Sequence, residues 1–247
     1  VFWIVLEYSD RKMLEFLMPA DIALETVGAY GVGHKLGAIM LLMVYSFNYA
    51  WRPYFLKENN VRSFQKISSY VFFGLGLFYI LLILYVDIIA TTTLPIINTS
   101  LIDAKFWEGI IIVPIIALAY IFHGSFILQE AGPFLSNKVY KISVCRGLGV
   151  ILNIMLNFIL ISCFEKQPYL GAAIATLVSY FSMSLMLYLW NYKESTFRYD
   201  NIMLIVISVN LGLAWYISTY DTVVLKILFP ILYIIQFKYY TTCKPVR

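Results

Sequence analysis

Long apolar stretches separated by short polar turns run through the whole chain. A bilayer core of about 30 Å requires roughly 20 mainly apolar residues per transmembrane helix, and seven stretches reach that length. Because the turns between them are short, we expect successive helices to be antiparallel neighbours. The pattern therefore predicts an all-α protein, a polytopic bundle of transmembrane helices. The predicted spans lie at residues 28–51, 68–93, 108–129, 142–163, 169–190, 201–218 and 222–240.

Residues 1–17 form an eighth apolar segment, which is shorter than the others and carries charged side chains. A charge at the bilayer centre costs about 2.5 to 3.5 kcal/mol on insertion scales. Glu7, Arg11 and Glu15 follow one another at intervals of four and share one side of a helix, with Asp10 one position round. Two interpretations remain open: a ladder of ion pairs near the membrane surface, or a helix that faces a water-filled cavity.

Lys35 is a second charged residue inside a predicted helix. It belongs to the stretch GAYGVGHKLGAIM, whose small residues permit close helix packing. Its ammonium group either reaches back to the membrane interface or shares a cavity with Arg11. The sequence does not decide between the two.

A polar stripe crosses the predicted helix at 142–163. Arg146, Asn153 and Asn157 recur there at helical spacing. Such stripes either join helices by hydrogen bonds or contact a ligand, and both interpretations remain open. Asp87 lies near the outer end of its own helix, where a single acid reaches water, and we assign it no role.

Composition places the chain among integral membrane proteins. Hydrophobic residues make up 61% of it, charged residues only 13%, and its mean hydropathy is +0.79, outside the range of ordinary soluble domains. Cys145, Cys163 and Cys243 lack the spacing of metal ligands, so we expect packing roles and no disulfide, metal or cofactor. We find no phosphate loop, histidine pair or Ser-His-Asp set that would indicate an enzyme.

Lysine and arginine are unevenly divided between alternate loops. Twelve of them fall in one set of loops, which includes residues 52–67, and two fall in the other set, which includes 94–106. Positive charge collects in short cytoplasmic loops, so we expect the first set and the C-terminus to be cytoplasmic. The net charge of +4 then follows from membrane topology and indicates no nucleic-acid partner. The twelve are Arg52, Lys57, Arg62, Lys66, Lys138, Lys141, Arg146, Lys193, Arg198, Lys238, Lys244 and Arg247.

Several motifs in order resemble a known family, and they extend over nearly the whole chain. They are Ser9-Asp10-Arg11, Val27-Gly28-Ala29-Tyr30, Lys35, the corner Ala50-Trp51-Arg52-Pro53, then Asn153 and Asn157, and Gly171-Ala172-Ala173-Ile174-Ala175-Thr176. This order is similar to the second half of bacterial polysaccharide-export flippases of the O-antigen type. These flippases are the lipid-linked oligosaccharide branch of the multidrug/oligosaccharidyl-lipid/polysaccharide superfamily. The loops PADIALET and CFEKQP depart from the pattern of that family.

The resemblance implies a fold of two six-helix lobes around a cavity that opens alternately to either side of a bacterial inner membrane. Residues 1–191 would be the second lobe, with its first helix truncated, and residues 192–247 an additional helix pair with a cytoplasmic tail. The chain would then be a fragment whose partners are the missing N-terminal lobe, the lipid bilayer and a polyprenyl-diphosphate-linked oligosaccharide. Translocation of that lipid for surface polysaccharide or lipopolysaccharide assembly makes and breaks no bond.

The resemblance also implies that the charged helix lines the transport cavity. We expect Arg11 and Lys35 to contact the diphosphate and sugar, because arginine donates paired hydrogen bonds to phosphate and lysine acts as a point charge. Glu7, Asp10 and Glu15 would hold Arg11 or set the charge balance of the cavity.

Three other functions stay open at this point. A cation-coupled multidrug exporter of the same fold would use Asp10 or Glu7 as ion sites. A membrane-embedded polysaccharide polymerase or ligase would need catalytic residues in a sizeable outer loop. A scaffold or broken gene product is the third possibility, because one lobe alone cannot form a two-lobed cavity.

Overall fold

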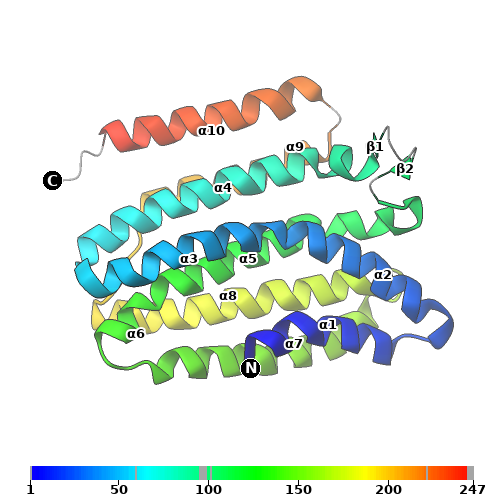
Figure 1. Cartoon of the computed structure of the whole chain (residues 1–247), viewed down its shortest axis with the longest axis horizontal. Coiled ribbons are helices and arrows are strands. Elements are labelled where there is room, and N and C mark those ends of the chain that lie inside the picture. The colour runs from blue at the N-terminus through cyan, green and yellow to red at the C-terminus, as the bar shows by residue number, and fades with distance from the viewer. Residues whose placement is uncertain (1, 59, 95–98, 101, 221, 244–247) are drawn as a thin grey trace.

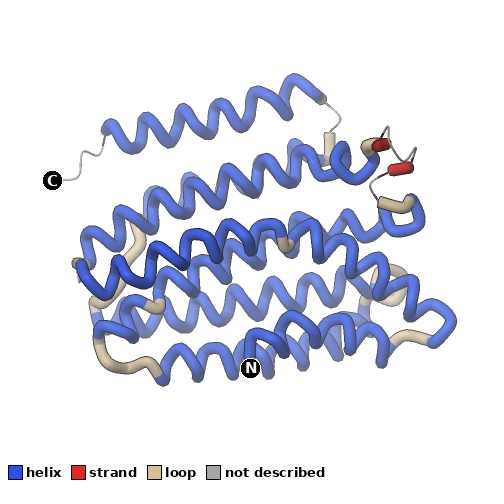
Figure 2. The backbone as a smooth tube through the Cα atoms, in the orientation of Figure 1, coloured by secondary structure: helices blue, strands red, loops and turns tan. Residues whose placement is uncertain are grey.

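The protein is a bundle of long helices that lie side by side (Figure 1), seen here in a computed structural model. The structure describes residues 2–58, 60–94, 99–100, 102–220 and 222–243. Apart from a short 3₁₀ helix η1 and one two-stranded antiparallel hairpin, the described elements are α-helices (Figure 2). In chain order the elements are α1 (Phe2–Leu17), α2 (Ala20–Gly37), α3 (Ile39–Glu58), α4 (Val61–Thr91), β1 (Thr93–Leu94), β2 (Thr99–Ser100), η1 (Ala104–Ile112), α5 (Val113–Gln129), α6 (Ala131–Leu135), α7 (Tyr140–Cys163), α8 (Pro168–Glu194), α9 (Asn201–Ser218) and α10 (Val223–Cys243).

Within the described residues, seven helical spans are long and apolar enough to cross a membrane, which agrees with the seven predicted spans. Two of them are composite, because α2 runs into α3 and η1 runs through α5 into α6. The seven spans are Ala20–Glu58, Val61–Thr91, Ala104–Leu135, Tyr140–Cys163, Pro168–Glu194, Asn201–Ser218 and Val223–Thr242.

Local sequence signals fix several of the helix ends. Asn60 caps α4 by accepting a hydrogen bond from the Arg62 backbone N–H at 3.0 Å, and Asp200 caps α9 in the same way. Such caps satisfy backbone donors that have no partner inside the helix. At the other end, Ser195 adopts the left-handed conformation that closes α8.

Pro53 does not end its helix, which corrects the expectation of a corner at Ala50-Trp51-Arg52-Pro53. Helix α3 continues through Pro53 to Glu58. A proline inside a helix leaves the carbonyl four residues earlier without its donor, and that residue, Tyr49, is on the exposed side of α3. Trp51 is buried, and its indole donates to the Leu128 carbonyl at 3.2 Å. Phe55, which follows the proline, is also buried, so side-chain packing holds α3 in place on both sides of Pro53.

Helix α5 is the centre of the bundle, and most of its side chains are buried. It packs against α3, α4 and α8, while α7 pairs with α8 and α1 lies against α7 and α2. Helices α9 and α10 pack on α4 at one edge of the bundle (Figure 1). Many large apolar side chains of α7, α9 and α10 are exposed, as expected for helices that face lipid.

The small residues of α2 bring its backbone against η1, as predicted. A Cβ atom on Gly33 would lie 1.9 Å from the Gly109 carbonyl oxygen, and one on Gly109 would lie 2.0 Å from the Ala29 carbonyl oxygen. No side chain fits at either position. This close approach sets the rotation of α2 and therefore decides which of its residues face the interior.

The cysteines are free where the structure describes them. Cys145 is buried, as predicted, and Cys163 is exposed. The side chain of Cys243, together with Lys244 and Arg247 and part of the loop at 94–106, lies outside the described residues.

Candidate functional site

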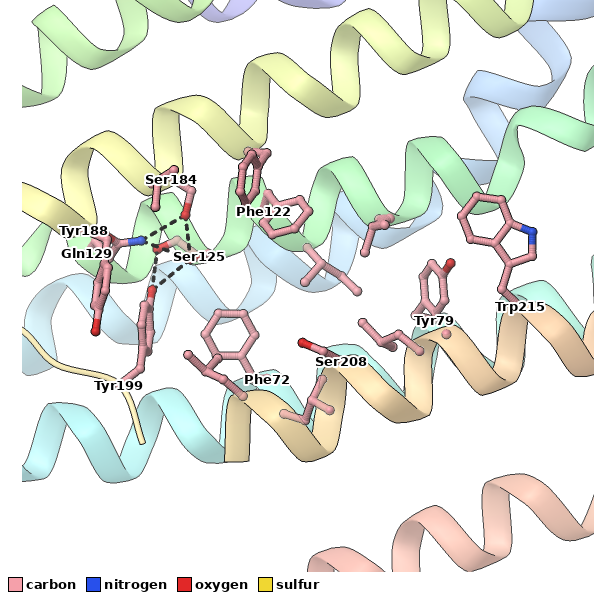
Figure 3. A pocket seen from close by; sticks show the side chains of 18 residues that line it. Phe72, Tyr79, Phe122, Ser125, Gln129, Ser184, Tyr188, Tyr199, Ser208 and Trp215 are labelled. Carbon is pink, nitrogen blue, oxygen red and sulfur yellow. Dashed lines mark hydrogen bonds between the residues drawn. The ribbon is translucent and has the colours of Figure 1, made fainter. Parts of the chain in front are cut away.

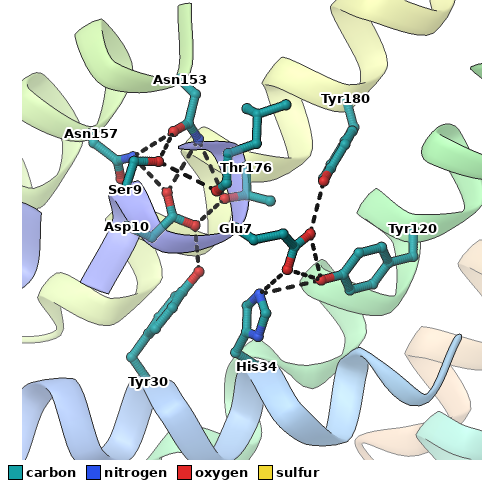
Figure 4. A network of polar contacts seen from close by, with 11 residues as sticks. Glu7, Ser9, Asp10, Tyr30, His34, Tyr120, Asn153, Asn157, Thr176 and Tyr180 are labelled. Carbon is teal, nitrogen blue, oxygen red and sulfur yellow. Dashed lines mark hydrogen bonds and ion pairs between the residues drawn. The ribbon is translucent and has the colours of Figure 1, made fainter. Parts of the chain in front are cut away.

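The two carboxylates Glu7 and Asp10 of α1 point into the bundle and meet polar side chains of four other helices (Figure 4). Asp10 is 1% exposed, and the side chain of Glu7 is 11% exposed. We call this set the acid cluster. Its members come from α1, α2, α5, α7 and α8, so only the folded bundle assembles it. They are Glu7, Asp10, Tyr30, His34, Tyr120, Asn153, Asn157, Thr176 and Tyr180.

Four side chains donate hydrogen bonds to the Asp10 carboxylate. The Tyr30 hydroxyl donates to Oδ2 at 2.5 Å, and the Thr176 hydroxyl donates to the same oxygen. The amide nitrogens of Asn157 and Asn153 donate to Oδ1 at 2.7 and 3.2 Å. A carboxylate withdrawn from water is costly unless its oxygens are paired. These donors therefore make a buried Asp10 tolerable.

Two tyrosines and a histidine surround Glu7. The Tyr120 hydroxyl lies 3.0 and 2.9 Å from the two carboxylate oxygens, and the Tyr180 hydroxyl donates to Oε1 at 2.9 Å. His34 Nε2 lies 3.5 Å from Oε2 and 3.3 Å from the Tyr120 hydroxyl. These partners belong to α5, α8 and α2, so Glu7 joins α1 to three neighbouring helices.

Hydrogen-bond donors surround Asp10. Its carboxylate accepts from the hydroxyls of Tyr30 and Thr176 and from the amide N–H groups of Asn153 and Asn157, while Asn157 Oδ1 has no hydrogen-bond partner among the described residues. Such donors stabilise the ionised carboxylate. To hold a hard cation, the asparagine side chains would have to turn their amide oxygens toward it. In the described part of the chain, no three His, Cys, Asp or Glu side chains come together as a metal-binding group.

A polar cavity of about 250 Å³ lies next to the acid cluster. We call it the arginine cleft, because arginines of two helices, α3 and α7, line it. The cleft is enclosed by side chains of α1, α3, α5, α7 and α8 together with Glu130, which lies between α5 and α6. Its lining consists of Leu6, Tyr45, Asn48, Arg52, His123, Ile127, Glu130, Arg146, Tyr180 and Met183.

The charges of the arginine cleft are only partly balanced. Arg146 Nη2 lies 2.6 Å from Glu130 Oε1, and its guanidinium also lies over the Phe126 ring at 5.4 Å. Arg52 is exposed, lies over the Phe134 ring at 5.1 Å and forms no ion pair within 4 Å of any described residue. The cleft thus holds two guanidinium groups and one carboxylate. Arginine presents paired N–H donors to phosphate and carboxylate groups, so the cleft can receive an anion.

Tyr180 joins the arginine cleft to the acid cluster. Its hydroxyl donates to Glu7, and its ring lies 5.0 Å from the ring of His123. His123 is 4% exposed, and its Nδ1 has no partner within the described residues. Tyr180 is therefore a side chain that the two sites share.

Of the two interpretations of α1, the ladder of ion pairs is not formed among the described residues. Glu7 meets the tyrosines instead of Arg11, and Glu15 pairs with Lys12 at 2.7 Å on the exposed side. Arg11 is half-buried beside the acid cluster, and its Nε has no partner among the described residues. Side-chain packing, rather than the four-residue spacing, decides these partners.

Lys35 does not join Arg11 at the acid cluster. Its side chain is exposed, whereas its neighbour His34 is buried in the cluster. Successive residues of an α-helix are turned by about 100°, so the two side chains leave α2 in different directions. The contact of Lys35 with a substrate stays a prediction.

The polar stripe of α7 is divided between the two sites. Asn153 and Asn157 are fully buried and bind Asp10, while Arg146 lies in the arginine cleft with Glu130. The asparagines thus join α7 to α1, which is the hydrogen-bonding interpretation of the stripe. Whether they also contact a ligand is not decided by these bonds.

Sequence reasoning missed several members of both sites. Tyr30, Tyr120 and Tyr180 could not be singled out, because the chain contains 20 tyrosines. Glu130 directly follows the predicted span 108–129 and lies inside the observed span Ala104–Leu135, where an acid is rare unless it is paired. Arg52 was counted only as a loop cation.

Comparisons with models of protein families, with curated proteins and with solved structures find no match to this chain.

Proposed function

We propose that this chain is the second lobe and terminal helix pair of a flippase that moves a polyprenyl-diphosphate-linked oligosaccharide across a bacterial cytoplasmic membrane. The observation that carries the proposal is the arginine cleft next to buried carboxylates, inside a bundle of membrane spans. Ionisable groups within membrane spans are costly and mark substrate or ion pathways. The order of motifs along the sequence supports the same family.

The arginine cleft is the stronger candidate for contact with the diphosphate. The cleft holds two guanidinium groups, those of Arg52 and Arg146, against the one carboxylate of Glu130. A diphosphate that moves from water into the bilayer needs hydrogen-bond donors, and the two guanidinium groups supply several N–H groups. Arg11, half-buried beside the acid cluster, remains a second candidate, and Lys35 is the weaker one.

Movement of the substrate would proceed by alternating access, with this lobe and a second one rocking about the cavity. In this proposal the acid cluster drives the change. Binding or loss of a proton or cation at Asp10 alters hydrogen bonds to α2, α7 and α8 together. Tyr180 then connects the acid cluster with the cleft.

Complementation of a flippase-null strain tests the proposal. We expect the double variant Arg52→Ala/Arg146→Ala to abolish surface polysaccharide while the protein stays at its normal level in the membrane. The double variant Arg52→Lys/Arg146→Lys should restore the polysaccharide only in part, because lysine lacks the paired donors of arginine. Arg62→Ala is the matched control, since Arg62 is exposed and does not line the cleft. Full surface staining by the double alanine variant, at equal protein level, would overturn the assignment of the cleft.

A second function, a cation-coupled exporter of small molecules, is favoured by one observation, the buried Asp10 carboxylate among polar side chains of three other helices. It predicts sodium or proton flux that depends on a small-molecule substrate and is lost in Asp10→Asn. Proteoliposomes with a pH-sensitive or sodium-sensitive dye measure that flux. Flux stimulated only by a polyprenyl diphosphate sugar supports the flippase instead.

A further inference from the structure

A lateral groove separates α8 from α9 on the membrane-spanning part of the bundle (Figure 3). Helices α4 and α5 form its floor, and its volume is about 530 Å³. Aromatic rings such as Phe72, Phe122 and Trp215 line it. Phe181 and Leu185 on its rim are 43% and 42% exposed, so the groove opens toward the bilayer.

An outer pocket of about 510 Å³ continues this groove at the end of α4 that lies away from the lysine-rich and arginine-rich loops. The two cavities share Trp215. Along α4 the lining passes from Tyr79 in the groove to Ile83 and Asp87 in the outer pocket, and residues four apart lie on one side of a helix. The groove and the pocket therefore lie end to end.

The outer pocket combines a carboxylate with two indole rings. Asp87 is exposed, and its carboxylate has no hydrogen bond or ion pair with any described residue. Trp107 and Trp215, which line the same pocket, are 40% and 39% exposed. Indole faces attract organic ammonium ions, and groups of aromatic rings recognise them. Tryptophan also prefers the membrane interface, the level at which lipid headgroups lie.

We propose that the outer pocket and the lateral groove together bind one phospholipid of the outer leaflet whose headgroup carries an ammonium ion, such as phosphatidylethanolamine. The ammonium would meet Asp87 and the indoles, and one acyl chain would lie in the groove. Asp87 and Phe72 are fifteen residues apart on α4, about 22 Å along the helix. That distance exceeds half of the bilayer core of about 30 Å, so the cavities are long enough for one chain.

The lipid is the favoured occupant because the groove opens sideways into the bilayer, where lipids are the abundant amphiphiles. The Asp87 carboxylate, which has no ion pair with a described residue, favours a headgroup that carries a positive charge over one that does not. The inference does not depend on the flippase proposal, since it concerns a face of the bundle away from the arginine cleft and the acid cluster.

Quenching of tryptophan fluorescence by brominated lipid chains tests the site. The intact protein is placed in nanodiscs that contain a small fraction of brominated phosphatidylethanolamine or, in the parallel sample, brominated phosphatidylglycerol with the same chains. The contribution of Trp215 is the difference between the wild type and Trp215→Phe. We expect the ethanolamine lipid to be enriched at Trp215 roughly fivefold over phosphatidylglycerol. That factor corresponds to one exposed ion pair together with a cation–π contact.

Two variants with matched controls separate the headgroup from the chain. Asp87→Asn should remove the enrichment, and Asp21→Asn, another exposed acid near the same membrane side that does not line the pocket, should keep it. Gly212→Leu should also remove it, because Gly212 lines the groove and a Cβ there meets nothing within 4 Å. Gly74→Leu should keep the enrichment, because Gly74 has equally open space around it but does not line the groove.

The results that would overturn the proposal are equally specific. Equal quenching by the two brominated lipids in the wild type would show that no ammonium headgroup is selected. Enrichment that survives Asp87→Asn would remove Asp87 from the site, and enrichment that survives Gly212→Leu would place the acyl chain elsewhere.

Discussion

Replacement of Asn157 by leucine tests whether α7 is held to α1 through a buried carboxylate. Asn157→Leu preserves the approximate volume of the side chain but removes the hydrogen bond from Nδ2 to Asp10 Oδ1, 2.7 Å long, and the one to Asn153 Oδ1, 3.1 Å long. The Asp10 carboxylate then keeps its remaining donors but stays buried. Water cannot replace the lost donor, so the full free energy of that hydrogen bond is lost from the folded state.

The magnitude follows from the charge of the partner. Hydrogen bonds to charged groups contribute about 1.5 to 3 kcal/mol, whereas interhelical hydrogen bonds between neutral groups in membranes average about 0.6 kcal/mol. We therefore expect Asn157→Leu to lower the free energy of unfolding by about 2 kcal/mol. Asn210→Leu is the matched control, because Asn210 bonds the neutral amide of Gln236 at 2.9 Å, and its loss should be about 0.6 kcal/mol.

A double-mutant cycle with Asp10→Asn isolates the pair. Equilibrium unfolding in mixed micelles, followed by circular dichroism, gives the free energies for each single variant and for the double variant. We expect a coupling energy of about 1 kcal/mol or more, since contacting residues in one network couple by 0.5 to 3 kcal/mol. Additivity within about 0.3 kcal/mol would refute the reasoning, because it would mean that Asn157 does not sense the carboxylate.

Three further predictions concern packing, topology and the exposed part of α1. Gly33→Val should prevent normal folding, because a Cβ would lie 1.9 Å from a carbonyl oxygen of η1. Gly31→Val should fold at wild-type yield, because a Cβ there meets nothing within 4 Å. Size-exclusion profiles of the two purified variants test this difference. In a background without cysteines, an impermeant thiol reagent applied to intact cells should label Lys105→Cys and leave Lys57→Cys unmodified, and the reverse pattern would invert the topology. Glu15→Gln should change the unfolding free energy by less than about 0.5 kcal/mol, because its ion pair is an exposed i,i+3 pair on a helix, and a larger loss in the same unfolding assay would contradict the surface placement.

The sequence by itself predicted the number and approximate place of the long apolar helices that the described residues form and that could span a membrane. Their apolar length is a property of consecutive residues, and lipid forces a backbone that crosses it to satisfy its own hydrogen bonds, so helices follow directly. The sequence also marked α1 as exceptional, because Glu7 and Asp10 are too costly in hydrocarbon to be there without partners. It could not name those partners.

Only the tertiary structure decided which side of each helix faces inward. Asp10 and Asn157 are 147 residues apart, and no periodicity along the chain connects them. The rotation of each helix results from backbone contacts such as that of Gly33 with Gly109 and from hydrogen bonds between helices, both of which depend on residues far apart in sequence. For this reason His34 lies in the acid cluster and Lys35 does not. The same cause brings Arg146 and Glu130 into one cleft, because packing of five helices, and no local pattern, sets their distance.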